Sequence, residues 1–184
     1  MSRVVLSIGS NLGDRMARLQ SVVDGLGAAV RAISPVYETD AWGGVEQGPF
    51  LNAVLIAEDP AVDCRGWLRR GQELEAAAER IRGQRWGPRT LDVDLVTCSE
   101  STEAGDAQVI LRDPELTLPH PHAHLRAFVL LPWLAIERDA TLTVAGAATP
   151  VTRLLDEIDP VERAGVRRTD LVLAAGDDET ELDA

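Results

Sequence analysis

The chain has 184 residues, of which 45% are hydrophobic and 4% aromatic, and its formal net charge is −12. A chain of this length fits one domain with a short tail, and it has enough apolar residues for a core. The negative charge argues against a general nucleic-acid binder. No apolar run reaches the length of a transmembrane helix, and the N-terminal apolar stretch is too short for a signal peptide, so we expect a cytoplasmic protein without a membrane segment.

Short apolar runs alternate with helical patterns along the chain. We expect a buried strand at 3–9, followed by a helix over 10–30 whose N-cap is Ser10 or Asn11. A second strand is predicted at 31–39, at a sheet edge because of Pro35. A third strand is predicted at 50–59, a helix at 62–82, and a fourth strand around Asp92 and Asp94. The remaining predicted elements are a short strand at 107–113, a helix at 124–138 interrupted near Pro132, and a short helix at 149–158.

The order βαββαβ with additions predicts an α+β fold of the ferredoxin-like type with additional C-terminal elements. We assign residues 1–165 to this domain and 166–176 to an added edge strand. Residues 177–184 are acidic and have little apolar surface to bury, which predicts a disordered tail.

The two cysteines, Cys64 and Cys98, lie far apart in the sequence and match neither a CxxC motif nor a zinc-ligand spacing. In a cytoplasmic protein such residues are typically reduced and structural. We therefore expect free thiols and no disulfide framework.

A basic cluster lies in the middle of this acidic chain. Between Arg65 and Arg89 there are seven arginines and three glutamates. The sequence contains no lysine, which excludes a P-loop lysine, so any phosphate would be held by arginine, histidine or backbone amides. Taken alone, arginines on a helix usually form a solvated face, and this interpretation suits Arg65, Arg69 and Arg70.

Two aspartates follow the basic cluster in the segment "RWGPRTLDVDLV". On a strand, side chains two residues apart share a face, so Asp92 and Asp94 would lie roughly 7 Å apart along the strand. Leu91, Val93 and Leu95 would point into the core on the other face. Two neighbouring carboxylates repel each other, so the arrangement calls for a positive partner.

Four blocks carry a resemblance to the 6-hydroxymethyl-7,8-dihydropterin pyrophosphokinase family. They are "SIGSNLGDR" at 7–15, "SPVYETDAWGGVEQGPFLNAV" at 34–54, "RIRGQRWGPRTLDVDLV" at 80–96 and "LTLPHPHAHLRAFVLLP" at 116–132. The third and fourth blocks are the most specific. The resemblance implies a magnesium-dependent enzyme of folate biosynthesis that transfers diphosphate from ATP to a pterin alcohol and releases AMP.

The resemblance also implies roles for individual residues. Asp92 and Asp94 would bind two Mg²⁺ ions that bridge them to the phosphates of ATP. The implied catalytic arginines are Arg80, Arg82 and Arg89, and the implied nucleotide-binding residues are Glu75, Trp86, Arg89, His120 and Arg126. The pterin would lie between the faces of Phe50 and Phe128 with Asn52 at its edge. Further implied pterin contacts are Asn11, Thr39, Ala41, Trp42 and Gly43.

Other interpretations of several of these residues remain open. Trp86 can be a core aromatic as well as part of a substrate-closing loop, and Trp42 can be a hydrophobic loop residue. Asn11 can serve as a helix cap. The alternating histidines of "PHPHAH" suggest a metal-binding tract when taken alone, but only His120 has a counterpart in the family motif.

Two other classes of function compete with the pyrophosphokinase. A non-enzymatic nucleotide sensor could share the fold, and a metal-dependent hydrolase could use the aspartates and histidines. We expect ATP and 6-hydroxymethyl-7,8-dihydropterin as the binding partners, no nucleic acid, and a monomer.

Overall fold

The computed structural model describes residues 1–41, 47–78 and 90–176. Six residues with predicted roles lie outside these ranges, and their roles stay predictions. They are Trp42, Gly43, Arg80, Arg82, Trp86 and Arg89. The predicted acidic tail, 177–184, also lies outside the described residues.

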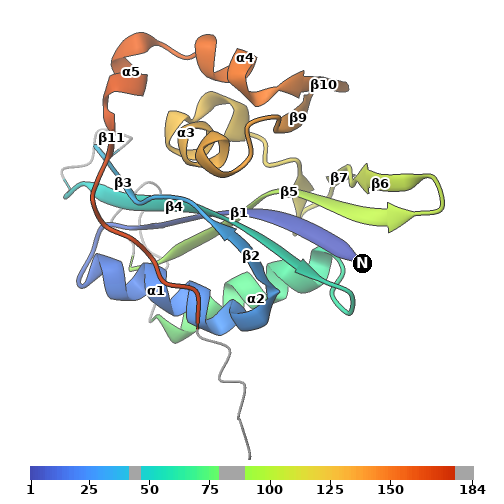
Figure 1. Cartoon of the computed structure of the whole chain (residues 1–184), viewed down its shortest axis with the longest axis horizontal. Coiled ribbons are helices and arrows are strands. Elements are labelled where there is room, and N and C mark those ends of the chain that lie inside the picture. The colour runs from blue at the N-terminus through green and yellow to red at the C-terminus, as the bar shows by residue number, and fades with distance from the viewer. Residues whose placement is uncertain (42–46, 79–89, 177–184) are drawn as a thin grey trace, which may run out of the picture.

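A seven-stranded antiparallel sheet forms the centre of the described structure (Figure 1). Its strand order is β11-β3-β4-β1-β5-β6, and β2 also pairs with β4. The strands are β1 (Ser2–Ser10), β2 (Val30–Ile33), β3 (Tyr37–Thr39), β4 (Phe50–Asp59), β5 (Asp92–Thr102), β6 (Gly105–Gln108) and β11 (Val166–Arg168). With the two helices between these strands, this order confirms the predicted ferredoxin-like α+β fold.

Helices cover both faces of the sheet (Figure 1). Helices α1 (Arg15–Leu26) and α2 (Cys64–Ala77) lie on one face, and α3 (Ala127–Ile136), α4 (Val151–Asp156) and α5 (Pro160–Ala164) lie on the other. The strands supply both cores because their side chains alternate: Val4 and Leu6 face the first layer of helices, whereas Val5 faces the second. No helix in the described ranges is long and apolar enough to cross a bilayer.

The smaller elements complete the chain. They are the 3₁₀ helices η1 (Gly27–Ala29) and η2 (Ala123–Leu125), the hairpin β7 (Leu111–Arg112) and β8 (Thr117–Leu118), and the hairpin β9 (Thr141–Val144) and β10 (Ala147–Pro150). The predicted strand at 107–113 is thus divided between β6 and β7. The predicted strand at 31–39 is divided too, because Ser34 leaves the ladder and bonds to the backbone of Val54 through both its N–H and its hydroxyl.

The predicted start of the first helix is wrong. Ser10 belongs to β1, and the N-cap of α1 is Asp14, whose carboxylate accepts a hydrogen bond from the Ala17 N–H at 3.0 Å. The predicted interruption at Pro132 is also wrong, since α3 runs through this residue. A proline removes one helical hydrogen bond and crowds the carbonyl four residues earlier, which often breaks a helix, but here Pro132 is buried and α3 continues to Ile136.

The expectation of free cysteines is wrong as well. Cys64 and Cys98 form a disulfide that joins the first residue of α2 to β5, with their Cα atoms 5.9 Å apart. Both residues lie in the core between the sheet and the first layer of helices, where α2 packs on β5. The pairing depends on this packing of segments separated by 34 residues, and no local spacing reveals it.

The end of the described chain crosses from one layer of helices to the other. Strand β11 pairs with β3, with Val166 opposite Thr39, and residues 169–174 then continue past the sheet edge to α1. There the Gln20 side chain forms two hydrogen bonds with the backbone of Ala174, and Leu173 is buried against the core. We call residues 166–174 the C-terminal strap. The predicted domain boundaries are not tested by these contacts and stay predictions.

Replacing Leu173 by Ala should destabilise the protein by about 2 to 5 kcal/mol, the usual cost of removing a buried leucine side chain. Leu173 is 3% exposed, whereas its neighbour Val172 is 78% exposed. Val172→Ala is therefore the matched control and should change the free energy of unfolding by less than about 0.5 kcal/mol. Urea unfolding measures both, and equal effects would show that the strap does not anchor the fold.

Candidate active site

Asp92 and Asp94 begin β5 and lie on the face of the sheet that α3 covers. Their register partners on β1 are Gly9 and Ser7. The side chains between and after them, Val93 and Leu95, are 6% and 4% exposed and belong to the opposite core. The alternation predicted from the sequence is therefore present, and the two carboxylates share one face.

The side chains of Arg126 and His120 approach Asp94 from the segment that leads into α3. The Arg126 guanidinium lies 3.6 Å from Asp94 Oδ2, and His120 Nε2 lies 3.8 Å from the same oxygen. The backbone N–H of His120 donates to the Val96 carbonyl at 2.8 Å, which fixes this segment to β5. The sheet and the segment before α3 together place negative and positive groups at one end of β5.

His120 is largely buried, with 18% of its side chain exposed. Burial, the Arg126 guanidinium and His122 lower the pKa of His120 from 6.5 to about 4, whereas Asp92 acts in the opposite direction. The His122 N–H donates to His120 Nδ1 at 3.1 Å, so in the neutral ring Nε2 carries the hydrogen. At neutral pH, His120 therefore presents an N–H donor toward Asp94.

Glu75 of α2 lies on the other face of β5. It is 5% exposed, and its carboxylate accepts a hydrogen bond from the Val93 N–H at 2.9 Å. Because Val93 stands between the two aspartates, Glu75 supports the backbone that carries them. Its predicted contact with nucleotide stays a prediction.

The predicted pterin contacts Asn52 and Thr39 meet across β4 and β3. The Asn52 side-chain amide donates to the Thr39 hydroxyl at 2.7 Å, and Asn52 is 4% exposed. Phe50 precedes Asn52 by two residues and therefore shares its face. Asn11, the other predicted amide, donates to the Gln47 side chain and to the Gly48 carbonyl.

Gly9 is a candidate site residue that the sequence analysis did not identify. It pairs with Asn52 on one side and with Asp92 on the other. A Cβ at this position would lie 2.7 Å from Asn52 Oδ1 and 3.6 Å from Phe50. A glycine inside a buried strand often marks a close approach of this kind, and that signal was present in "SIGSN".

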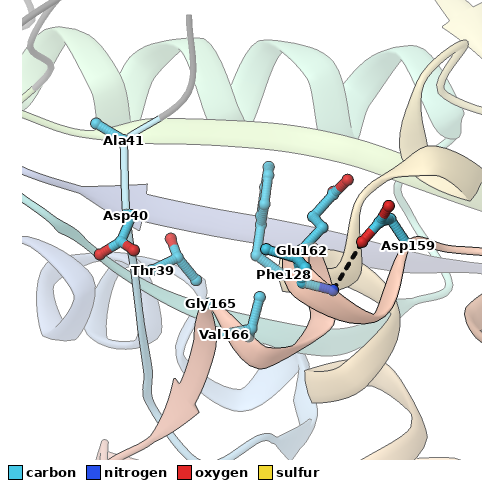
Figure 2. Close-up of a pocket in the computed structure, with 9 residues that line it drawn as sticks. Thr39, Asp40, Ala41, Phe128, Asp159, Glu162, Gly165 and Val166 are labelled. Carbon is cyan, nitrogen blue, oxygen red and sulfur yellow. Dashed lines mark hydrogen bonds between the residues drawn. The ribbon is translucent and has the colours of Figure 1, made fainter. Parts of the chain in front are cut away.

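A cavity of about 610 Å³ lies beside Phe128 of α3 (Figure 2). Three predicted pterin contacts line it, namely Thr39, Ala41 and Phe128. The other lining residues were not predicted: Asp40, Asp159, Val161, Glu162, Gly165 and Val166. Helix α5 and β11 thus form one wall, which the sequence could not reveal because the fold alone brings them back to β3.

Phe128 lies between two chemically different regions. The Arg126 guanidinium carbon is 5.5 Å from the centre of the Phe128 ring, and the same arginine faces Asp94. Phe128 also lines the cavity, whose wall carries the carboxylates of Asp40, Asp159 and Glu162.

Among the described residues, no group of three or more histidines, cysteines or acids could hold a metal by itself.

Acidification should destabilise the protein through His120. Histidine in an unfolded chain titrates near 6.5, whereas here its pKa is about 4, so between these values only the unfolded chain binds the proton. The free energy of unfolding should therefore fall, by up to roughly 3 kcal/mol, as the pH drops from 6.5 to 4. In urea unfolding without divalent cations, the wild type should lose stability relative to His120→Asn over this interval. If the difference in the free energy of unfolding between the wild type and His120→Asn did not change with pH, it would contradict the lowered pKa of His120.

Comparison with known proteins gives close relatives for this arrangement. The family model described as 7,8-dihydro-6-hydroxymethylpterin-pyrophosphokinase (HPPK) matches residues 5–138. The 2-amino-4-hydroxy-6-hydroxymethyldihydropteridine pyrophosphokinase of Mycobacterium tuberculosis (strain ATCC 25618 / H37Rv) is 65% identical over 169 residues, which are 91% of this chain and 89% of the relative. The protein of the same name from Mycobacterium leprae is 65% identical over 175 residues, 94% of this chain and 92% of the relative.

Solved structures agree on the fold. The HPPK-DHPS protein of Plasmodium falciparum, solved as a triple mutant with pteroate, matches 91% of this chain with a TM-score of 0.61 and 12% identity. The match covers 46% of that longer chain. At this identity the likeness concerns the fold alone. The family match and the two mycobacterial relatives show that the chain belongs to the 7,8-dihydro-6-hydroxymethylpterin pyrophosphokinase family.

Proposed function

We propose that this chain transfers the diphosphate group of ATP to the hydroxymethyl group of 6-hydroxymethyl-7,8-dihydropterin, a step of folate biosynthesis. The pterin alcohol oxygen attacks the β-phosphorus, and the bond from that phosphorus to the oxygen of the α-phosphate breaks. AMP leaves with that oxygen, and the alcohol proton passes to solvent. Family membership and the pair Asp92 and Asp94, opposed by His120 and Arg126, support this proposal.

The donor set on β5 fits magnesium. Mg²⁺ prefers oxygen ligands and is usually held by one or two carboxylates together with substrate phosphates. Asp92 and Asp94 provide two carboxylates on one face, and 33% of the Asp94 side chain is exposed. We propose that they hold two Mg²⁺ ions, which neutralise charge on the polyphosphate when bound.

Arg126 and His120 both offer hydrogen-bond donors that suit the polyphosphate. Arg126 offers a fixed fork of donors for phosphate oxygens, and neutral His120 offers one N–H donor. Asp94 lies near both side chains, so it keeps them beside the position proposed for the phosphates. The family also implies phosphate contacts for Arg80, Arg82 and Arg89, so the described residues form only part of this proposed surface.

The pterin is neutral and flat, and the side of the site formed by β3 and β4 suits it. The hydrogen bond from Asn52 to Thr39 orients the Asn52 amide, so that its carbonyl oxygen stays directed over Gly9. Phe50 and Phe128 supply aromatic faces for a bicyclic ring. Positioning of this kind, together with electrostatic stabilisation, provides most of the catalysis in phosphoryl transfer.

Measurement of AMP separates this proposal from its alternatives. The pyrophosphokinase forms AMP from ATP only when 6-hydroxymethyl-7,8-dihydropterin is present. A nucleotide sensor would bind ATP and form no AMP, and a metal-dependent hydrolase would cleave ATP without the pterin.

We also expect a monomer located in the cytoplasm.

Replacing Asp94 by Ala should lower kcat by on the order of a hundredfold or more, the usual size of a single electrostatic contribution to catalysis. Asp92→Ala should have a similar effect, because both carboxylates are proposed to hold the Mg²⁺ ions. Asp106→Ala, in the exposed hairpin at the far end of β5, is the control and should retain wild-type activity. Near-normal AMP formation by Asp94→Ala would contradict the proposed role.

Replacing Gly9 by Ala should impair pterin binding more than nucleotide binding. The added methyl group would lie 2.7 Å from Asn52 Oδ1, so the amide must move and weaken its bond to Thr39. We expect the KM for the pterin to rise tenfold or more and the KM for ATP to change less than twofold. Gly176→Ala, where a Cβ meets no atom within 4 Å, should leave both constants unchanged. An unchanged KM for the pterin in Gly9→Ala would show that Asn52 is not a pterin contact.

A further inference from the structure

Arg15 joins two strands at the end of the sheet where the pterin is proposed to bind. Strand β3 ends at Thr39 and β4 begins at Phe50, and these two residues are partners in the ladder. Arg15 Nη1 donates to the Pro49 carbonyl at 2.9 Å and to Glu38 Oε2 at 3.1 Å. It therefore contacts the residue next to each member of this last β3–β4 pair.

The charge of Arg15 does not serve the helix that it begins. Arg15 is the first residue of α1, and the first turn of α1 contains no acidic residue. The N-terminus of a helix carries a partial positive charge, so a cation there is unfavourable for the helix. The two contacts with β3 and with the residue before β4 give this arginine a different purpose.

The segment that contains Arg15 also holds the residues that lead into β4. Asn11 Nδ2 donates to Gln47 Oε1 at 2.8 Å and to the Gly48 carbonyl at 3.1 Å. Together with the Arg15 bond to Pro49, three successive residues before β4 are bonded to residues 11–15. The ends of secondary-structure elements open most readily, so such contacts matter most at the end of a ladder.

Glu38 is held from two sides. Its Oε2 accepts from Arg15, and its Oε1 lies 3.8 Å from Nη2 of Arg167, its register partner in the C-terminal strap. The side chains of Arg15 and Glu38 are 31% and 33% exposed. An isolated exposed ion pair contributes little, but a network of several charges has a more defined geometry. Arginines from opposite ends of the chain thus fix the carboxylate that Arg15 contacts.

We propose that Arg15 is a positioning residue for the pterin, and that it acts through the pair formed by Thr39 and Phe50. The inference rests on the proposed function, in which Phe50 offers a stacking face and Thr39 accepts the hydrogen bond of the Asn52 amide. Stacking depends on the distance and angle of the aromatic face, so a displaced Phe50 backbone would weaken pterin binding. The described residues proposed to bind phosphate lie on β5 and before α3, so nucleotide binding should depend much less on Arg15.

Calorimetry tests this proposal with two ligands. They are a non-hydrolysable ATP analogue, titrated with Mg²⁺ present, and 6-hydroxymethyl-7,8-dihydropterin, titrated into the protein with Mg²⁺ and that analogue. Arg15→Ala should raise the Kd of the pterin about fivefold or more, the factor that one hydrogen bond typically contributes. The Kd of the ATP analogue should change less than about twofold. Arg15→Lys should restore most of the pterin affinity, because both bonds of Arg15 leave from one nitrogen and an ammonium group also has several donors.

Arg31→Ala is the matched control. Like Arg15, Arg31 bonds one carboxylate and one backbone carbonyl, those of Glu58 at 3.3 Å and Ala28 at 2.8 Å. These contacts lie near the other end of β4, since β4 ends at Asp59. Both dissociation constants should stay within about twofold of the wild type in Arg31→Ala.

A second pair of variants separates positioning from a general loss of structure. In a Phe50→Ala protein, the further change Arg15→Ala should weaken pterin binding by less than about twofold, because the face that Arg15 positions is already absent. Thermal unfolding should show that the variants are folded. If Arg15→Ala did not fold, Glu38→Gln would take its place, since it removes the charge that holds Arg15 and should weaken binding of the pterin alone.

An unchanged pterin affinity in Arg15→Ala would overturn the proposal, and so would an equal loss of affinity for both ligands. The proposed function is tested separately by AMP formation. A wild type that bound both ligands but formed no AMP would overturn the proposed function and leave the role of Arg15 in pterin binding intact.

Discussion

The pairing of β1 with β4 and β5 is the constraint on which the site depends. Gly9 lies opposite Asn52 on one side and Asp92 on the other. One row across three strands therefore carries an amide, a glycine without a side chain, and a carboxylate. Neighbouring strands are about 4.8 Å apart, which places the two functional side chains about 10 Å from each other across the row. A register slip of one residue would turn Asp92 and Asp94 toward the opposite layer of helices. The same alternation that builds the two cores therefore also directs the residues of the proposed site.

Much of this arrangement follows from local sequence. Alternating or continuous apolar runs reveal β1, β4 and β5, and the spacing of Asp92 and Asp94 reveals their shared face. What the sequence could not provide depends on contacts between distant segments. The disulfide requires α2 to pack on β5, and the role of Gly9 becomes specific only when Asn52 is opposite it. The first helix was predicted to begin too early, because several residues that favour N-caps precede it and only the fold selects Asp14.

The described site separates two kinds of chemistry within one helix. Arg126, at the N-cap of α3, faces Asp94, and Phe128, two residues later, lines the cavity bounded by α5. An anion and a neutral ring can thus bind on either side of one short segment. This separation limits misplacement of the two substrates, because Asp40, Asp159 and Glu162 line the cavity and their negative charge repels phosphate. The buried Glu75 supports β5 from the other face, so the carboxylates stand on backbone fixed from both sides.

The C-terminal strap also determines when the binding cavity can form during protein synthesis. The ribosome makes the chain from the N-terminus, and the strands β1, β4 and β5 can pair before the strap exists. The wall that carries Glu162 comes later, and it is fastened only when Val166 pairs with Thr39 and Leu173 reaches the core under α1. A nascent chain that has folded its sheet therefore already holds Asp92 and Asp94 in register, but it has an open cavity beside Phe128. The two aspartates proposed to hold Mg²⁺ are thus in place earlier in synthesis than the complete cavity.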